Sequence, residues 1–163
     1  MLPNDAGSAR PSSLDKLPAE RVAWQALLKV LEQEEEALVE GEADLLPKLS
    51  AAKMAQLQTL NTLARARHDG LLSAGLSADP AGMDAWLERD GTAEQQVLWE
   101  SLQKMEQQAQ AMNQRIGVLI ELRLNSTRQA LNVLVQAAKS QGGLYDQGGC
   151  SVASRNGKPL TAA

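Results

Sequence analysis

The fold is decided by residues 92–140, which read TAEQQVLWESLQKMEQQAQAMNQRIGVLIELRLNSTRQALNVLVQAAKS. Thr92 followed by Gln95 is typical of a capping box at the start of a helix, where each side chain bonds the other residue's backbone N–H. Apolar residues then recur at alternating steps of four and three, the spacing of one face of an α-helix. The first such series is Leu98, Leu102, Met105, Ala109, Met112, Ile116 and Leu119. The stretch therefore predicts a helix of about 49 residues, roughly 70 Å long if it is unbroken.

The apolar pattern of this helix changes phase near Ile120. The second series, offset by one residue, is Ile120, Leu124, Thr127, Leu131, Leu134 and Ala138. Consecutive steps of four join the two series across Gly117, and such a stutter locally unwinds a supercoil. Glycine at this point permits close packing or a bend. Two possibilities remain for residues 120–140. The helix breaks near Asn125 and folds back, or it continues with its apolar stripe exposed as a partner site.

Two further long helices are predicted upstream. The first covers about residues 18–40, with Pro18 in its first turn and Gly41 as its C-cap. The second follows the tight turn EGEAD, with Asp44 as its N-cap and Pro47 in its first turn, where proline is tolerated. So short a turn makes the two helices an antiparallel hairpin. Their apolar faces are Trp24, Leu27, Leu28, Val30, Leu31, Glu35 and Leu38, then Leu49, Lys53, Leu57, Leu60, Ala64 and Leu71.

A short helix is predicted between the hairpin and the long helix. Asp79 and Pro80 have the order of an N-cap and first helical residue, and Gly91 ends the element. Its small apolar face contains Met83, Trp86 and Leu87. We expect about two turns that cover one end of the bundle. The fold class is therefore all-α: an antiparallel helical bundle of the up-and-down, four-helix type, with one very long C-terminal helix and a short connecting helix.

Composition supports a helical domain and argues against several functions. Hydrophobic residues make up 44% of the 163 residues but aromatics only 2%, so aliphatic side chains must form the core. We expect a disordered N-terminus at 1–12, a single helical bundle domain at 13–140 and a flexible Gly/Ser-rich tail at 141–163. A net charge of −4 disfavours nucleic-acid binding and adsorption to anionic membranes. The absence of a long apolar run and of a signal-like start favours a cytoplasmic protein without stable membrane insertion.

Chemical motifs do not point to catalysis. A di-metal carboxylate bundle needs Glu-x-x-His, but the single histidine, His68, has Arg65 at the third position before it. We interpret His68 as a surface residue near a helix end. The single cysteine, Cys150, has no nearby base and is interpreted as an inert thiol. No phosphate-binding glycine motif is present. We therefore predict no catalytic residues, no metal, no cofactor and no enzyme activity.

Three other groups of residues have ordinary structural interpretations. Met54, Met105 and Met112 are expected to fill the core, and Trp24, Trp86 and Trp99 to pack around the short helix. The carboxylates Glu32, Glu36 and Glu40 fall at steps of four on one helical face. That face is expected to be solvated, with docking to a basic surface as the alternative.

The segment SQGGLYDQGG, residues 140–149, contains the only tyrosine. Tyr145 is flanked by glycine pairs beyond the end of the long helical pattern. It either packs back onto the bundle or serves as a mobile anchor for a second partner, because a single aromatic ring can dominate a contact.

Three segments resemble the FlgN family of bacterial flagellar export chaperones. Residues 27–63, LLKVLEQEEEALVEGEADLLPKLSAAKMAQLQTLNTL, resemble its N-terminal hairpin. Residues 112–134, MNQRIGVLIELRLNSTRQALNVL, resemble its Asn-x-x-Asn-Gly-x-Leu-Ile segment, with Ile116 in place of the usual second Asn. Residues 143–149, GLYDQGG, resemble its late tyrosine followed by glycine. The resemblance covers roughly residues 17–149 and rests on the order and spacing of the segments.

The resemblance implies a cytoplasmic chaperone that binds the terminal helical segments of the hook–filament junction proteins FlgK and FlgL. It also implies delivery to the export-gate protein FlhA of the flagellar type III system. The implied client-binding residues are Ile120, Leu124, Leu131, Leu134, Val135 and Ala138. Docking to the gate is implied for Leu144 and Tyr145. The alternative is a structural coiled-coil adaptor that self-associates, as a homodimer for example, through the same long helix.

Overall fold

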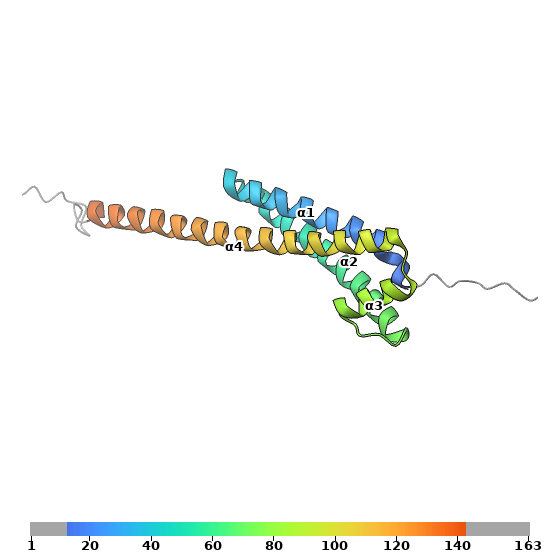
Figure 1. The fold of residues 1–163 in the computed structure, drawn as a ribbon. Helices are drawn as coiled ribbons and strands as arrows, with labels where there is room; N and C mark the ends of the chain where they lie inside the picture. Colours follow the sequence, from blue (N-terminus) through green and yellow to red (C-terminus); the bar gives the residue numbers. More distant parts are fainter. Residues whose placement is uncertain (1–12, 143–163) are drawn as a thin grey trace, which may run out of the picture. The chain divides into compact units, whose positions relative to one another are not determined.

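The computed structural model describes residues 13–142, and all regular elements in this range are helical (Figure 1). The internal contacts divide the chain into two units, Met1–Ile120 and Glu121–Ala163. The first unit contains a helical hairpin, a short helix and the first part of a long helix. The second contains the remainder of that long helix. The predicted all-α bundle with a very long C-terminal helix and a short connecting helix is confirmed.

The hairpin consists of α1 (Leu17–Glu40) and α2 (Leu46–Ser73), with the 3-10 helix η1 (Ser13–Lys16) before α1. Gly41 ends α1 in the left-handed conformation, at φ 82°, and its N–H donates to the carbonyl of Ala37 at 3.0 Å. Glycine adopts this conformation more readily than other residues, and so it suits the end of a helix. The predicted C-cap at Gly41 is confirmed.

The predicted N-cap of the second helix is wrong. A 3-10 helix, η2 (Ala43–Leu45), fills the turn, and the cap position of α2 is Leu45, which makes no side-chain cap bond. The N–H of Leu45 donates to the carbonyl of Glu42 at 3.1 Å, so the backbone itself closes the turn. This leaves Asp44 inside η2 instead of at the start of α2. Pro47 does lie in the first turn of α2, as predicted.

The short helix α3 (Pro80–Asp90) begins where its cap signal predicts. The Asp79 carboxylate accepts from the N–H of Gly82 at 2.8 Å, and the hydroxyl of Ser77 donates to the same carboxylate at 2.6 Å. The N–H of Gly91 closes the other end on the carbonyl of Leu87 at 3.0 Å. With 11 residues, α3 makes about three turns and is one turn longer than expected.

The long helix α4 (Ala93–Gly142) contains 50 residues. Its capping box is formed: the N–H of Thr92 donates to Gln95 Oε1 at 2.9 Å, and the N–H of Gln95 donates to Thr92 Oγ1 at 3.2 Å. The helix continues past Asn125, so the possibility that it breaks and folds back there is wrong. A Cβ placed on Gly117 would meet no atom of the described residues, so this glycine serves no close packing among them.

The core of the first unit has two parts. One joins α1, α2 and α4: Ala23, Leu27, Leu28, Leu31, Leu38, Leu60, Ala109, Met112 and Ile116. The other gathers α3 against η1 and the adjoining ends of the longer helices: Leu14, Leu17, Leu71, Met83, Trp86, Leu87, Trp99 and Leu102. Trp24 packs against both parts. The short helix therefore covers one end of the bundle, with tryptophans around it, as predicted.

One expected core residue is placed differently. Met54 is 55% exposed, whereas Met112 is buried and Met105 packs against the first part of the core. On α2 only Leu60 and Leu71 are buried, so its buried face is narrower than the sequence suggests. Met54 points away from that face.

Ion pairs explain the two charged residues, Lys53 and Glu35, that fall within the predicted apolar faces of α2 and α1. Lys53 Nζ lies 2.8 Å from a carboxylate oxygen of Glu34, which is largely buried on α1. Arg115 on α4 pairs with Glu35 through Nε and Nη2, at 2.9 and 3.1 Å. Lys53 and Glu35 therefore fit within these helical faces because each forms an ion pair with a residue of the facing helix.

Candidate functional site

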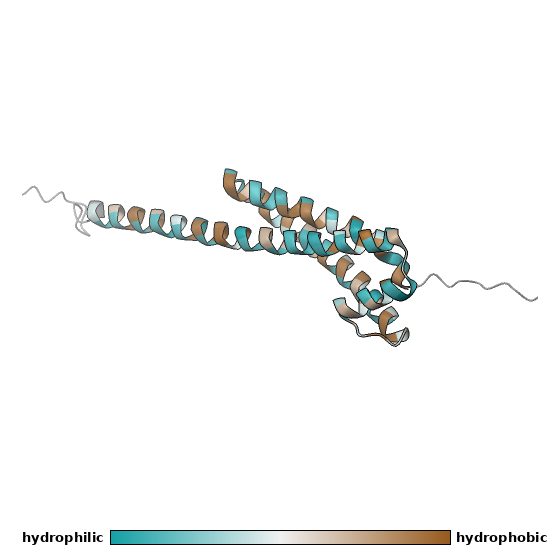
Figure 2. Ribbon diagram, viewed as in Figure 1, coloured by the Kyte–Doolittle hydropathy of each residue, from teal (hydrophilic) through white to brown (hydrophobic). Residues whose placement is uncertain are grey.

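The C-terminal part of α4 carries the predicted client-binding residues. Every side chain from Glu121 to Ser140 is exposed. Ile120, the last residue of the first unit, is 40% exposed, and Leu134 is 66% exposed. The remaining predicted residues of this set are Leu124, Leu131, Val135 and Ala138, all exposed. We call these six residues the α4 stripe. Brown apolar turns alternate with teal turns along this part of the ribbon (Figure 2).

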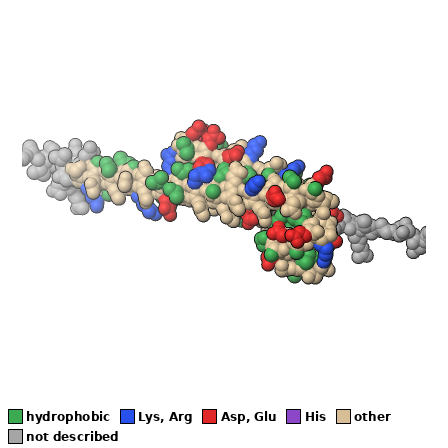
Figure 3. All heavy atoms as spheres, in the orientation of Figure 1, with side chains coloured by type: hydrophobic (Ala, Val, Ile, Leu, Met, Phe, Trp, Pro, Cys, Tyr) green, Lys and Arg blue, Asp and Glu red, His purple; other side chains and the backbone are tan. Residues whose placement is uncertain are grey.

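Helical geometry places the α4 stripe on one face. With 3.6 residues per turn, the steps that separate its members bring all six side chains to the same side of the helix. Leu122 and Val133, also well exposed, fall on the opposite side by the same geometry. Figure 3 shows hydrophobic side chains at the surface of this part of α4, with basic side chains beside them.

Earlier in α4 the same spacing has a different outcome. Leu102, Ala109, Met112 and Ile116 are buried in the core of the first unit. The spacing predicts an apolar face in both parts of the helix, but among the described residues only the face in the first part is buried. An exposed apolar face of this length is typical of a surface that binds another molecule.

The predicted gate-docking residues, Leu144 and Tyr145, lie outside the residues that the structure describes, and so does Cys150. Gate docking by Leu144 and Tyr145 stays a prediction from the resemblance, and the interpretation of Cys150 as an inert thiol stays a prediction from the sequence.

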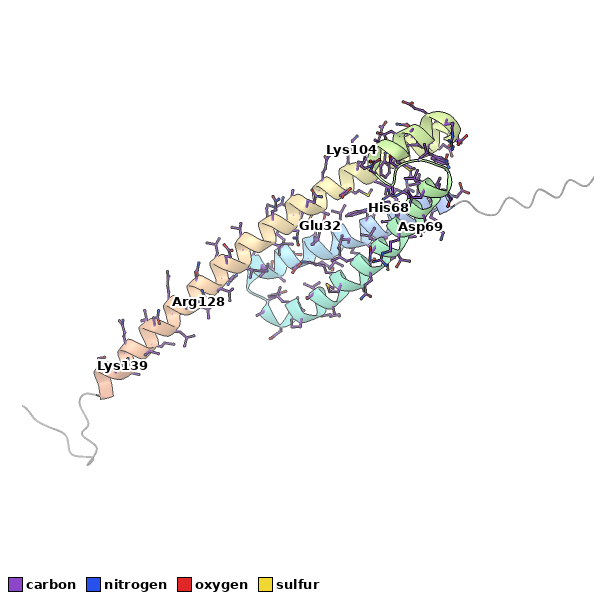
Figure 4. The ribbon with its side chains drawn as sticks, turned by 90° about the horizontal axis from the view of Figure 1, so that it is seen from below. Glu32, His68, Asp69, Lys104, Arg128 and Lys139 are labelled. Atoms are coloured by element: carbon purple, nitrogen blue, oxygen red, sulfur yellow. The ribbon has the colours of Figure 1, made fainter. Side chains whose placement is uncertain are left out.

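Two adjoining hollows lie on the surface of the first unit. The larger has a volume of ≈ 330 Å³ and is lined by α1, α2 and α4, with Trp24, Leu57 and His68 among its side chains. The smaller has ≈ 230 Å³ and shares Trp24 and Leu57 with it. Figure 4 labels His68 beside Asp69 near the end of α2. His68 is half-buried in this wall, so the expectation of a plain surface histidine is only partly correct.

A buried ion pair borders the larger hollow. Glu20 on α1 accepts from Arg67 on α2 at 3.1 to 3.3 Å, through both carboxylate oxygens. The guanidinium of Arg67 also lies 4.9 Å from the ring centroid of Trp99, a cation–π distance. Because no buried side-chain polar atom of the described residues lacks a hydrogen-bond partner, we interpret this wall as a structural contact between α1, α2 and α4.

Carboxylates on α1 divide between paired and solvated positions. Hydrogen bonding from Arg115 lowers the pKa of Glu35 below its ordinary value, the charge of Arg115 acts in the same direction, and burial opposes both. Glu32, Glu36 and Glu40 are exposed, as the spacing predicts (Figure 4 labels Glu32). The pairing of Glu35 joins α1 to α4, whereas the outer row, Glu32, Glu36 and Glu40, faces solvent.

Within residues 13–142, no group of three or more His, Cys, Asp or Glu side chains is placed to hold a metal ion. None of the described helices combines the length and the apolar character needed to cross a membrane.

These features define an all-α protein with an amphipathic helix face open to solvent. A model of the FlgN protein family matches residues 12–151. The chain therefore belongs to the FlgN family, and the resemblance inferred from its three segments is confirmed. Neither curated proteins nor solved structures give a match.

Proposed function

We propose that the protein is a cytoplasmic flagellar export chaperone. It binds the terminal helical segments of hook–filament junction proteins of the FlgK and FlgL type. It then delivers them to FlhA at the flagellar type III export gate. Membership of the FlgN family supports the chaperone role. The observation that carries the proposal is the exposed α4 stripe on a continuous helix. The proposal assigns no catalysis and no cofactor.

The physical basis is helix-on-helix recognition. An amphipathic client helix lays its apolar face along the α4 stripe and removes both faces from water. Full burial of one leucine side chain contributes about 1.5–3 kcal/mol. Ordering a disordered client segment costs a few kcal/mol of that gain. The balance favours a moderate affinity, which suits a chaperone that must release its client for export.

The test measures binding of a labelled peptide from the C-terminal helical segment of a FlgK-type client to the full chain by fluorescence anisotropy. Leu131→Asp with Leu134→Asp places two charges on the α4 stripe, and we expect binding to be abolished. The matched control is Leu122→Asp with Val133→Asp, which adds the same charges to exposed positions on the opposite side of α4. This control should bind close to normally.

Circular dichroism of both variants must show the helical content of the original chain, because only then does lost binding report on contacts. If the stripe variant binds the client as well as the control does, the site is placed wrongly. A stable homodimer that buries the stripe and ignores the peptide would instead favour the structural adaptor.

Gate docking is assigned to Leu144 and Tyr145, which follow the stripe in the sequence. Tyr145→Ala should leave client binding unchanged and weaken capture of the cytoplasmic domain of FlhA. Loss of client binding in this variant would instead make the tyrosine part of the client site.

A further inference from the structure

The charge of the segment around the α4 stripe differs from that of the whole chain. The chain has a net charge of −4, yet residues 122–140 contain Arg123, Arg128 and Lys139 and no Asp or Glu. Glu121 directly precedes this segment, and other acidic residues lie farther away, in the outer row of α1 for example. Within residues 122–140 the exposed apolar face is therefore accompanied only by cations, over about five helical turns. At the N-terminal end of the α4 stripe, Glu121 is exposed and falls on the same flank as Arg128 and Lys139.

Helical geometry places these cations beside the stripe. Arg128 and Lys139 are about three turns apart and fall on the same flank, next to Val135. Arg123 falls on the other flank. Arg128 and Lys139 are both exposed, and no ion pair joins either to an acidic side chain of the described residues (Figure 4 labels both).

From this arrangement we propose that the α4 stripe selects an amphipathic partner helix whose apolar face is bordered by Asp or Glu. This inference rests on the proposed function and specifies the chemistry of its client. Such a partner places carboxylates against Arg128 and Lys139 while its apolar face covers the stripe. Exposed pairs of this kind add little affinity individually, but they set orientation, partner choice and association rate.

The same charges disfavour a second copy of this chain as the occupant. If the α4 stripe pairs with that of a second copy, in either direction, each helix brings three cations and one carboxylate, Glu121, to the contact. The single carboxylate beside the stripe, Glu121, offsets only part of the repulsion among three cations. Like-charge contacts of this kind reduce the affinity for the wrong partner.

The experiment uses three synthetic helical peptides with one apolar face and with Glu, Gln or Lys at the flanking positions. Their dissociation constants for the full chain are measured by anisotropy at low and high salt. At low salt the Glu peptide should bind about threefold to tenfold more tightly than the Gln peptide, and the Lys peptide most weakly. The differences should shrink at high salt because exposed pairs are screened.

Charge reversal provides the decisive variant. Arg128→Glu with Lys139→Glu should invert the order, so that the Lys peptide binds best. Lys29→Glu with Lys104→Glu, at exposed positions in the first unit, changes the net charge equally and should keep the original order.

The alternatives give distinct results. Equal binding of the Glu and Gln peptides at low salt overturns the charge preference while the helix-binding site stands. Failure of all three peptides and of the client peptide overturns the proposed function itself. Binding to anionic vesicles that Leu131→Asp with Leu134→Asp removes, without peptide binding, assigns the stripe to a membrane and overturns both. A dimer at low salt that the same two substitutions dissociate also overturns the inference.

Discussion

Glu20 and Arg67 lie 47 residues apart in the sequence and form a two-oxygen ion pair between α1 and α2, at 3.1 to 3.3 Å. Their side chains are only 4% and 14% exposed. Trp99 of α4 lies against the guanidinium, so one arginine joins three helices. Such a pair is weak evidence for stability as a whole, yet its disruption is costly because a buried charge loses its partner.

Arg67→Met should therefore lower the free energy of unfolding by about 3–5 kcal/mol. Adding Glu20→Met should recover most of that loss, because two apolar side chains then replace two charges. Urea unfolding of the two variants measures both effects. The exposed pair between Arg89 and Asp90 is the control, and Arg89→Met should change little. A double variant as unstable as the single one would contradict this account.

Neighbouring leucines on α2 give a direct test of the core. Leu71 is fully buried and Leu72 is 60% exposed. Leu71→Ala should cost about 2–5 kcal/mol because it leaves a cavity. Leu72→Ala should change stability by less than about 0.5 kcal/mol. Urea midpoints measured at an unchanged slope give the comparison, and similar losses for the two variants would show that the α2 face is assigned wrongly.

The cap of α3 predicts a pH dependence. Hydrogen bonds from the Ser77 hydroxyl and then the Gly82 N–H hold the pKa of Asp79 below its ordinary value of 3.8. A depressed carboxyl pKa stabilises the fold above the ordinary value, and that contribution disappears as pH falls through the lower folded value. Asp79→Ala should therefore destabilise the protein at pH 7, and the gap should narrow below pH 3.8.

Denaturant unfolding at neutral and acidic pH measures that gap. Asp79→Asn is the control, because it keeps a cap acceptor but does not titrate. A gap between the original chain and Asp79→Ala that stays constant into acid would exclude the carboxylate as its source.

Alanine substitution of two helical glycines, Gly117 and Gly82, should change the stability of the protein in opposite directions. A Cβ on Gly117 meets open space, so Gly117→Ala should stabilise α4 by about 0.5–1 kcal/mol through helix propensity. A Cβ on Gly82 would collide with the backbone carbonyl of Ser77, so Gly82→Ala should destabilise the protein by displacing that loop. Thermal unfolding measures both changes. A stabilised Gly82→Ala variant would show that the loop can move freely.

Local signals explain how much of the fold the sequence predicts. Asp79 before Pro80, and Thr92 with Gln95, determine helix starts through bonds within a few residues, and both predictions are confirmed. The prediction of Asp44 as an N-cap is wrong because a backbone hydrogen bond closes the turn in place of its side chain. The Glu20–Arg67 pair could not be predicted from local sequence. Two charged residues this far apart in the sequence are each expected to be solvated.

The candidate site is predictable only in part for a related reason. Apolar spacing identifies which side chains share a face, but it does not reveal what covers that face. Ile116 and Leu131 belong to similar patterns, and one is buried while the other is 55% exposed. Coverage depends on the lengths and positions of other helices, which no pattern within α4 contains.

The continuity of α4 has a consequence for how its exposed half becomes ordered. The first turn of a helix is the unfavourable step, and later residues add one at a time at little cost. Residues 121–140 continue a helix whose first part is packed in the core of the first unit, so they extend a nucleus that already exists. A proline at Leu122 would interrupt this propagation and disorganise the whole recognition face without replacing any residue of the α4 stripe.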